Sequence, residues 1–293
     1  MSMIMTKMMM TLSFLAGASV AVSAAAQDIN AHSGWGSASI YAGAVSFEPD
    51  EVDVDRNYDN LVGVKINYGM VMDNGLLGNI NFVHEMGTMA PTDNDETRHS
   101  NMLDFHLNFV SPDTFSYGAF AGLATTKDNG DNGEHDMPPI KFGGIEGSFV
   151  RGRLTVGSQV GALIAKDFYG EAYDNATFAS IYADFRIQDN TILGLRLSTL
   201  EGSRRNDDEA NGNRGTITAQ TISIEHGFTS KPISLWAEID ADDFNAEDES
   251  DDPWVKEIRV GLTYRFGEKD PSVGRSALPK INRWLAVATN EIE

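Results

Sequence analysis

The sequence predicts an all-β fold: a transmembrane, antiparallel, up-and-down β-barrel of twelve strands. Three observations lead to this fold class. Segments of about ten residues alternate between apolar and polar side chains along most of the chain. The connections between these segments are alternately short and long, and the long ones are acidic. No apolar run long enough for a membrane-spanning helix follows the first 26 residues, so any later membrane insertion must be as a closed barrel.

The segment from Trp254 to Phe266 shows the alternation most clearly. Its period of two predicts a β-strand. A strand that is apolar and aromatic on one side and polar on the other suits a wall between lipid and a wet lumen. The apolar face carries Trp254, Ile258, Val260, Leu262, Tyr264 and Phe266, and the polar face carries Glu257, Arg259, Gly261, Thr263 and Arg265.

Eleven further segments complete the predicted strand set. Several are joined by turn-forming residues, such as Asp73–Gly75, which is a strong hairpin signal. An opening strand is expected at about Ser37 to Phe47, although the facing of its residues is ambiguous. An even total of twelve fits a single-chain bacterial barrel. The other ten segments span residues 62–70, 76–85, 103–109, 115–123, 145–149, 154–164, 179–187, 193–198, 222–228 and 233–239.

The connections indicate how such a barrel is oriented. Long acidic connections begin near residues 48, 86, 125, 167, 201 and 241 and alternate with turns of a few residues. Long loops on one rim and short turns on the other are typical of barrels whose short turns face the periplasm, which would place both chain ends there. Aromatic side chains beside the short-turn rim predict an interfacial girdle: Tyr68, Phe109, Phe115, Tyr117, Phe149, Phe185, Phe228, Tyr264 and Phe266.

The N-terminal segment predicts export. Lys7 precedes the apolar run Met8–Val22, and the small residues Ser23–Ala26 lead into polar Gln27, as in a secretory signal. A membrane anchor or a buried helix is the alternative, but the run is short for either a span or an anchor. The predicted division of the chain is a signal peptide at 1–26, an N-terminal periplasmic lead at 27–36, a barrel at 37–266 and a periplasmic tail at 267–293.

The composition excludes several functions. The 293 residues contain no Cys, so the exported fold does not depend on disulfides. A formal net charge of -21 makes nucleic acid an unsuitable partner. The acid is concentrated in the connections, which predicts a solvated rim that disfavours anions. Weak binding of divalent cations at these acidic loops, bridging to lipopolysaccharide phosphates, is an alternative.

A soluble barrel is the main alternative for each segment taken alone. In that fold the apolar face would turn inward and the charged face outward, around a very large apolar core. The signal sequence, the even count and the alternating connections together favour the membrane barrel. Residues 37–266 resemble small porin-type outer-membrane proteins of Gram-negative bacteria, through the alternation and the aromatic-ended last strand. This resemblance implies an outer-membrane location, with membrane lipid and lipopolysaccharide as neighbours.

The predicted lumen suggests a diffusion channel. Twelve strands about 4.8 Å apart and tilted about 40° give a backbone cylinder roughly 24 Å across and a lumen on the order of 10 Å. Opposed charges in such a lumen would set a size limit and a transverse field for small hydrophilic solutes or ions. Alternatively, the charges pair and fill a non-conducting structural or surface barrel. The candidate pore-lining residues are Lys65, Glu85, Asp104, His106, Lys141, Arg186, Arg196, Glu225, Glu238, Glu257 and Arg259.

Catalysis, cofactors and metal centres are not predicted. Twelve-strand lipid hydrolases need a Ser and a His within hydrogen-bond reach. Here the lumen-facing His106 and Ser223 fall on opposite walls of the expected barrel. The stretch Asp128–Gly133 resembles the start of a calcium loop, but Pro139 stands where the closing Glu is needed.

The chain continues beyond the aromatic-ended strand, which departs from the porin pattern. Pro279 precedes Ile281, Trp284, Leu285 and Ala288, which are spaced as one face of a short helix. A periplasmic lid, a plug in the lumen and a frayed tail are the three hypotheses for this segment, in that order of preference.

Overall fold

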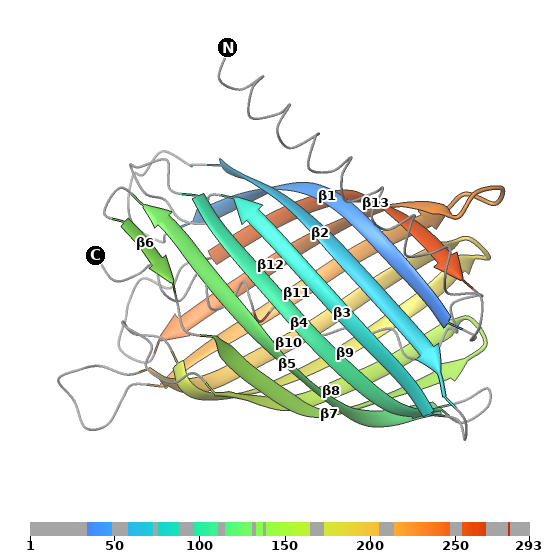
Figure 1. The fold of residues 1–293 in the computed structure, drawn as a ribbon, viewed down its shortest axis with the longest axis horizontal. Helices are drawn as coiled ribbons and strands as arrows, with labels where there is room; N and C mark the ends of the chain where they lie inside the picture. Colours follow the sequence, from blue (N-terminus) through green and yellow to red (C-terminus); the bar gives the residue numbers. More distant parts are fainter. Residues whose placement is uncertain are drawn as a thin grey trace, which may run out of the picture.

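Twelve long antiparallel strands close into a tilted barrel in the computed structural model (Figure 1). The predicted fold class is therefore confirmed. The structure describes residues 34–48, 58–72, 76–87, 97–110, 115–130, 133–136, 139–164, 173–204, 214–246, 254–267 and 281. The barrel strands are β1 (Gly34–Glu48), β2 (Tyr58–Val71), β3 (Leu76–Gly87), β4 (Thr97–Val110), β5 (Phe115–Gly130), β7 (Ile140–Arg151), β8 (Leu154–Ile164), β9 (Tyr173–Gln188), β10 (Thr191–Arg204), β11 (Arg214–Gly227), β12 (Ile233–Ala246) and β13 (Trp254–Gly267).

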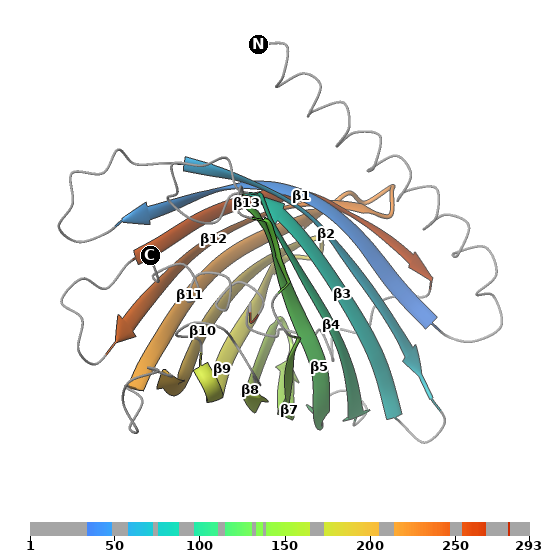
Figure 2. The same ribbon diagram turned by 60° about the vertical axis from the view of Figure 1, so that its left-hand side comes forward.

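The circle closes where the first strand meets the last. β1 pairs with β13 from Trp35↔Gly267 to Glu48↔Trp254, and on its other side it pairs with β2. This register settles the facing of β1 that the sequence left ambiguous: Ile40 points outward and Ser39 and Tyr41 point inward. The turned view in Figure 2 shows the strands following one another around the wall in chain order.

The two rims differ as the sequence predicts. At one rim, called the turn rim, strands are joined by residues 72–75, 111–114, 152–153, 189–190 and 228–232, and Gly34 and Gly267 lie there too. Gly152 has a φ of 60°, which a two-residue hairpin turn requires and glycine adopts without strain. The opposite rim, called the loop rim, carries the longer connections 49–57, 88–96, 131–139, 165–172, 205–213 and 247–253.

Two acidic stretches expected to be loops are partly strand. β5 continues to Gly130 and pairs with a short strand, β6 (Gly133–Asp136), so the backbone of the loop near residue 130 is a hairpin extension. β12 continues to Ala246, so Asp240 and Asp242 lie within the wall. Acidic composition alone does not break a strand when neighbouring backbone groups remain paired.

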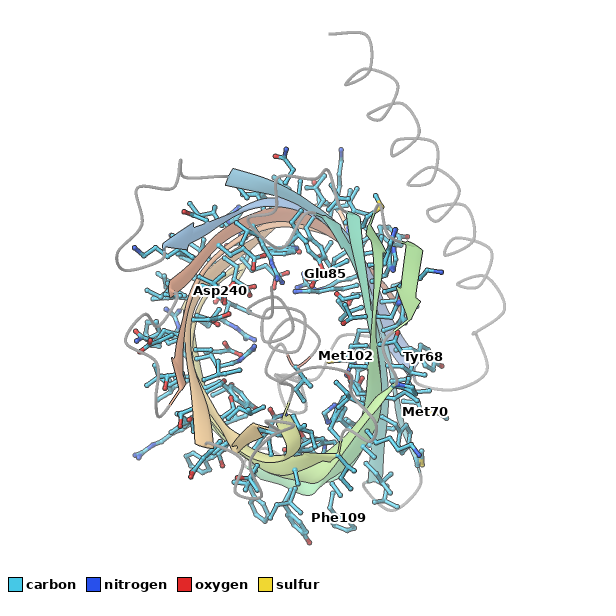
Figure 3. All side chains as sticks on the ribbon, turned by 90° about the vertical axis from the view of Figure 1, so that its left-hand side faces the viewer. Tyr68, Met70, Glu85, Met102, Phe109 and Asp240 are labelled. Atoms are coloured by element: carbon cyan, nitrogen blue, oxygen red, sulfur yellow. The ribbon has the colours of Figure 1, made fainter. Side chains whose placement is uncertain are left out.

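The outer surface of the barrel is apolar. Exposed Leu, Ile, Val and Phe side chains occur on most strands, with Ile145 at 67% exposure. Figure 3 looks along the barrel and shows Tyr68, Met70 and Phe109 outside, while Glu85, Met102 and Asp240 lie inside. Such a continuous apolar surface is unfavourable in water and suited to a bilayer. No helix among the described residues is long and apolar enough to cross a membrane.

Aromatic side chains gather near the turn rim on this outer surface. Phe115 and Tyr117 on β5 stack on one another and Phe109 on β4 joins them, with ring centroids 5.9–6.0 Å apart. Tyr264 and Phe266 stack in the same way on β13, at 6.5 Å. Tyr117 and Tyr264 suit the lipid–water interface at this depth, because each combines an apolar ring with a polar hydroxyl, and the Phe rings pack beside them.

Candidate functional site: the barrel lumen

The strand register places ten of the eleven predicted lining residues on the inward face. They are Lys65, Glu85, Asp104, His106, Arg186, Arg196, Glu225, Glu238, Glu257 and Arg259. Lys141 does not face the lumen. It pairs with Leu123 and Ile164, whose exposed side chains lie on the outer surface. The assignment of Lys141 is corrected because the period of two puts it on the same face as Ile145.

Arg259 on β13 is the centre of the first polar cluster. Its Nη1 lies 3.0 Å from Glu85 Oε1 on β3, and its Nη2 donates to Glu257 Oε2 at 3.0 Å. Nε donates to the other oxygen of Glu257, which makes that pair bidentate. The hydroxyl of Tyr41 donates to Glu85 at 2.6 Å. Arg259 is 1% exposed, so the guanidinium is held by paired carboxylates rather than by water.

Aromatic rings and a small residue complete this cluster. Lys65 Nζ lies 5.1 Å from the Tyr41 ring centroid and 5.0 Å from that of Trp236, within cation–π range. Gly63 on β2 leaves the space that the Tyr41 ring occupies, because a Cβ at this position would lie 2.2 Å from Tyr41 Cζ. The Arg259 cluster therefore ties β13, β1, β2 and β3 together across the seam of the barrel.

His106 on β4 is the centre of a second cluster. Its Nε2 lies 2.8 Å from Asp104 Oδ1 and its Nδ1 lies 2.7 Å from Glu146 Oε1 on β7. Glu146 also accepts from Asn108 Nδ2 at 2.6 Å and from Gln159 Nε2 at 2.8 Å. Donation from both imidazole nitrogens requires the imidazolium form. In that form the ring would bridge the two carboxylates as a cation.

This geometry does not resemble that of a hydrolase triad. Both nitrogens of His106 face carboxylates, which leaves neither for a serine hydroxyl. Ser223 lies on β11 and lines the cavity described next, whereas His106 lies on β4. Among the described residues no cluster of His, Cys, Asp or Glu has the arrangement of a metal site.

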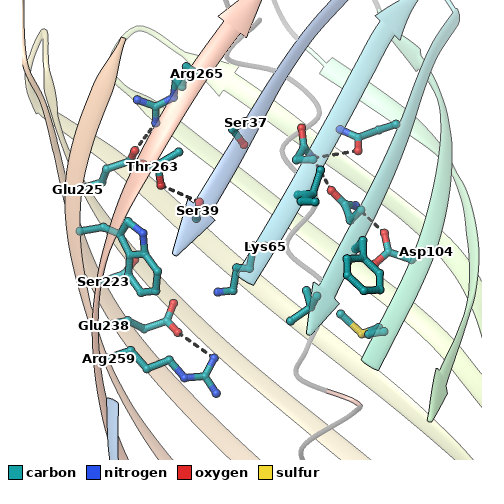
Figure 4. Close-up of a pocket in the computed structure, with 18 of the residues that line it drawn as sticks. Ser37, Ser39, Lys65, Asp104, Ser223, Glu225, Glu238, Arg259, Thr263 and Arg265 are labelled. Atoms are coloured by element: carbon teal, nitrogen blue, oxygen red, sulfur yellow. Dashed lines mark hydrogen bonds and ion pairs between the residues drawn. The ribbon is translucent and has the colours of Figure 1, made fainter. Parts of the chain in front are cut away.

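Two neighbouring cavities lie in the lumen between the turn rim and the middle of the barrel. The inner one, of about 330 Å³, is bordered by Lys65, Glu238 and Arg259 and is drawn in Figure 4. The outer one, of about 600 Å³, includes residues of the turn rim such as Gly152 and Asn190. Five residues line both cavities: Trp35, Ser37, Asn67, Glu225 and Arg265. The two cavities are therefore adjacent, and charged, amide and hydroxyl side chains are part of the lining of both.

Acidic side chains outnumber basic ones on the described lumen wall. Asp240 and Asp242 contribute to this excess, and Thr221 donates to Asp240 Oδ1 at 2.6 Å. Their acidic run predicts a loop, although Ile239 and Ala241 continue the alternation. The inward acids are Glu85, Asp104, Glu146, Asp184, Glu225, Glu238, Asp240, Asp242 and Glu257, and the inward Lys and Arg are Lys65, Arg186, Arg196, Arg259 and Arg265.

The loop-rim half of the lumen carries many inward apolar side chains beside charged ones such as Glu85 and Glu257, and the alternation does not predict them. Inward apolar residues from every barrel strand form one cluster, called here the lumenal apolar ring. Most of them lie in the loop-rim half of their strands. An apolar residue on the inward face does not follow the pattern of apolar outside and polar inside. The ring comprises Tyr41, Val45, Leu61, Val83, Met102, Phe120, Ala124, Ile140, Phe142, Leu163, Ala176, Phe178, Leu200, Ile217, Ala219, Trp236 and Val255.

Ile281 from the C-terminal tail belongs to this same cluster and is 0% exposed. This residue is therefore inside the barrel and not in a lid outside it. The rest of the predicted tail, 268–280 and 282–293, lies outside the described residues, as do the predicted signal peptide and most of the N-terminal lead.

Comparison with known proteins agrees with the barrel. No family model and no curated protein matches the sequence. Among solved structures, an outer-membrane channel from Pseudomonas putida F1 matches with a TM-score of 0.55 and 13% identity, over 80% of this chain and 96% of that one. The translocator domain of the autotransporter NalP from Neisseria meningitidis matches with a TM-score of 0.50 and 12% identity, over 87% and 96%.

The fold is that of a transmembrane β-barrel, as in these two structures. At this level of identity the likeness shows the fold alone, while the lipid-facing surface described above supports the membrane location independently. The contents of the lumen must indicate what the barrel does.

Proposed function

We propose that the protein is a channel for passive diffusion of small hydrophilic solutes or ions, with no covalent step. The observation that carries the proposal is the pair of adjacent cavities between the turn rim and the barrel centre, which charged and polar side chains line in part. Their walls present charges, amides and hydroxyls, which can replace part of the hydration shell of a passing solute. A barrel that served only as a scaffold would have no need of such a space.

The wall charges favour cations. Carboxylates outnumber Lys and Arg among the described inward residues, and several border the inner cavity, including Glu238 and Glu85. In a narrow space with low-dielectric walls, fixed negative charge raises the local concentration of cations and lowers that of anions. Anionic oligosaccharides are therefore poor candidates for the transported solute.

The surroundings follow from the same proposal. The loop rim would face the cell exterior, beside lipopolysaccharide, and the turn rim the periplasm. Weak binding of divalent cations at the acidic loop rim is part of this proposal, since carboxylates there would lie near lipid phosphates.

Swelling of liposomes in graded uncharged solutes tests the channel. Because Ile281 lies in the loop-rim half of the lumen, we would measure both the full-length protein and its Ile281→Asp variant. We expect at least one of them to admit small sugars and to exclude larger oligosaccharides. Retarded migration after heating would first establish that each barrel is folded. Folded protein of both forms with no swelling and no ion current would overturn the proposal.

A non-conducting structural barrel is the second candidate. One observation favours it: the inward apolar residues of the loop-rim half are buried, so this half of the lumen is filled. The same experiment separates the two functions, because a structural barrel would remain impermeable whether or not the tail is altered.

A further inference from the structure

We propose that residues 279–288 of the C-terminal tail dock inside the barrel against the lumenal apolar ring and act as a built-in plug. The proposal concerns where the tail binds, so it stands whether or not the barrel conducts. It assigns a partner to an internal surface that a water-filled channel would not need.

The ring is the surface to be covered. Leu200, Ile217 and Val255 are each 0% exposed although their side chains point toward the lumen. Apolar side chains around the whole circumference would be wetted in an open pore, which is unfavourable. A segment that fills the space between them would remove this apolar surface from water.

Ile281 identifies the segment that fills it. It is the one described residue beyond Gly267, it is helical, and it is packed in the apolar cluster with no exposed surface. Trp284, Leu285 and Ala288 follow at spacings of three, four and seven residues. In a helix these positions share the face of Ile281, so one short helix would present a continuous apolar stripe to the ring.

The length of the chain fits this route. Thirteen residues, 268–280, connect Gly267 at the turn rim with Ile281. Fully extended, such a connection reaches about 46–50 Å. A fourteen-residue strand such as β13, tilted by about 40°, rises about 35 Å along the barrel axis. The connection is long enough to pass up through the lumen, whereas a path along the outside would cross lipid with unpaired backbone groups.

Charge supports the same position. Lys280 and Arg283 flank Ile281 in the sequence. The lumen wall is acidic near the ring, with Asp240 and Asp242 on β12 and Glu257 on β13. A basic segment among these carboxylates is electrostatically favoured. The other half of the lumen, where the polar cavities lie, would contain the connecting residues and remain wet.

Disulfide trapping tests the docking directly, because the native chain has no Cys. Ile281→Cys would be combined in turn with Leu61→Cys, Leu200→Cys, Ile217→Cys and Val255→Cys in the full-length folded protein. A disulfide forms only when the two Cβ atoms come to about 4 Å. We expect at least one pair to cross-link in high yield on mild oxidation. The matched control, Ile281→Cys with Lys256→Cys, should not cross-link, since Lys256 faces outward beside Val255.

Labelling with a large water-soluble maleimide gives a second readout. We expect the single Ile281→Cys variant to react at least tenfold more slowly in the folded barrel than after denaturation. Ser230→Cys, in an exposed turn, should react fast in both states. Fast labelling of Ile281→Cys in the folded protein, or no cross-link in any of the four pairs, would overturn the docking proposal. Efficient cross-linking of these pairs together with a folded but silent Ile281→Asp variant would instead count against the channel and leave the docking proposal standing.

Discussion

Replacing Arg259 with Met should strongly destabilise the barrel. The change removes the partner of Glu85, 3.0 Å away, and of Glu257, which the guanidinium binds through two nitrogens. Two buried carboxylates would be left without their common cation. Removing one member of a buried ion pair typically costs about 3–5 kcal/mol. The adjoining cavity admits water and screens part of this cost, so we expect a loss of about 2–4 kcal/mol.

Urea titration of the refolded protein in detergent or lipid measures this loss. With a slope of about 2 kcal/mol per molar urea, the midpoint should fall by about 1–2 M. The matched control is Arg265→Met on the same strand. Arg265 pairs with Glu225, but the two side chains are 32% and 22% exposed, so the loss should be below about 1 kcal/mol.

A double variant tests the cause. Adding Glu257→Gln to Arg259→Met should recover part of the midpoint, because one uncompensated charge is removed. Equal midpoints for Arg259→Met and Arg265→Met, or no recovery in the double variant, would refute the assignment of the Arg259 cluster as the electrostatic tie across the seam.

Three further substitutions probe the packing, the lipid face and the selectivity. Gly63→Ala should destabilise the barrel by about 1–3 kcal/mol in the urea titration, because the new Cβ would overlap the Tyr41 ring. The control Gly147→Ala should leave the urea midpoint unchanged, because the nearest atom to its Cβ would be 3.4 Å away. Equal effects of the two substitutions would contradict the packing argument. Ile145→Arg should cost about 2–4 kcal/mol in lipid, and stability equal to the parent would argue against a lipid-facing Ile145. Glu238→Gln, made in the Ile281→Asp background, should move the reversal potential in a salt gradient toward that of a non-selective pore. An unchanged reversal potential would show that this carboxylate does not act on passing ions.

Much of the fold is predictable from the sequence because one physical rule applies to every strand. β13 alternates as expected, and the short turns and long connections fall near the predicted residues. β1 was ambiguous because its Ala, Ser and Gly residues fit either environment. The acidic run at Asp240 and Asp242 predicts a loop, yet the strand pairing continues through both residues.

The interior was less predictable, since facing alone does not say what a side chain meets. The inward facing of Glu85 and Arg259 follows from alternation, but their contact joins two strands that do not pair with each other. The lumenal apolar ring is hard to detect in the sequence because each of the twelve strands contributes only one or two of its members. A single inward apolar residue such as Leu200 or Ile217 does not indicate a cluster. The apolar surface forms only when barrel closure brings these residues together.

Single-channel recording in planar bilayers tests the central claim most directly. The account predicts that the full-length protein is mostly closed, that Ile281→Asp produces discrete current steps, and that the reversal potential in a salt gradient has the sign of cation preference. Folded full-length and Ile281→Asp proteins that both leave the bilayer silent would contradict it.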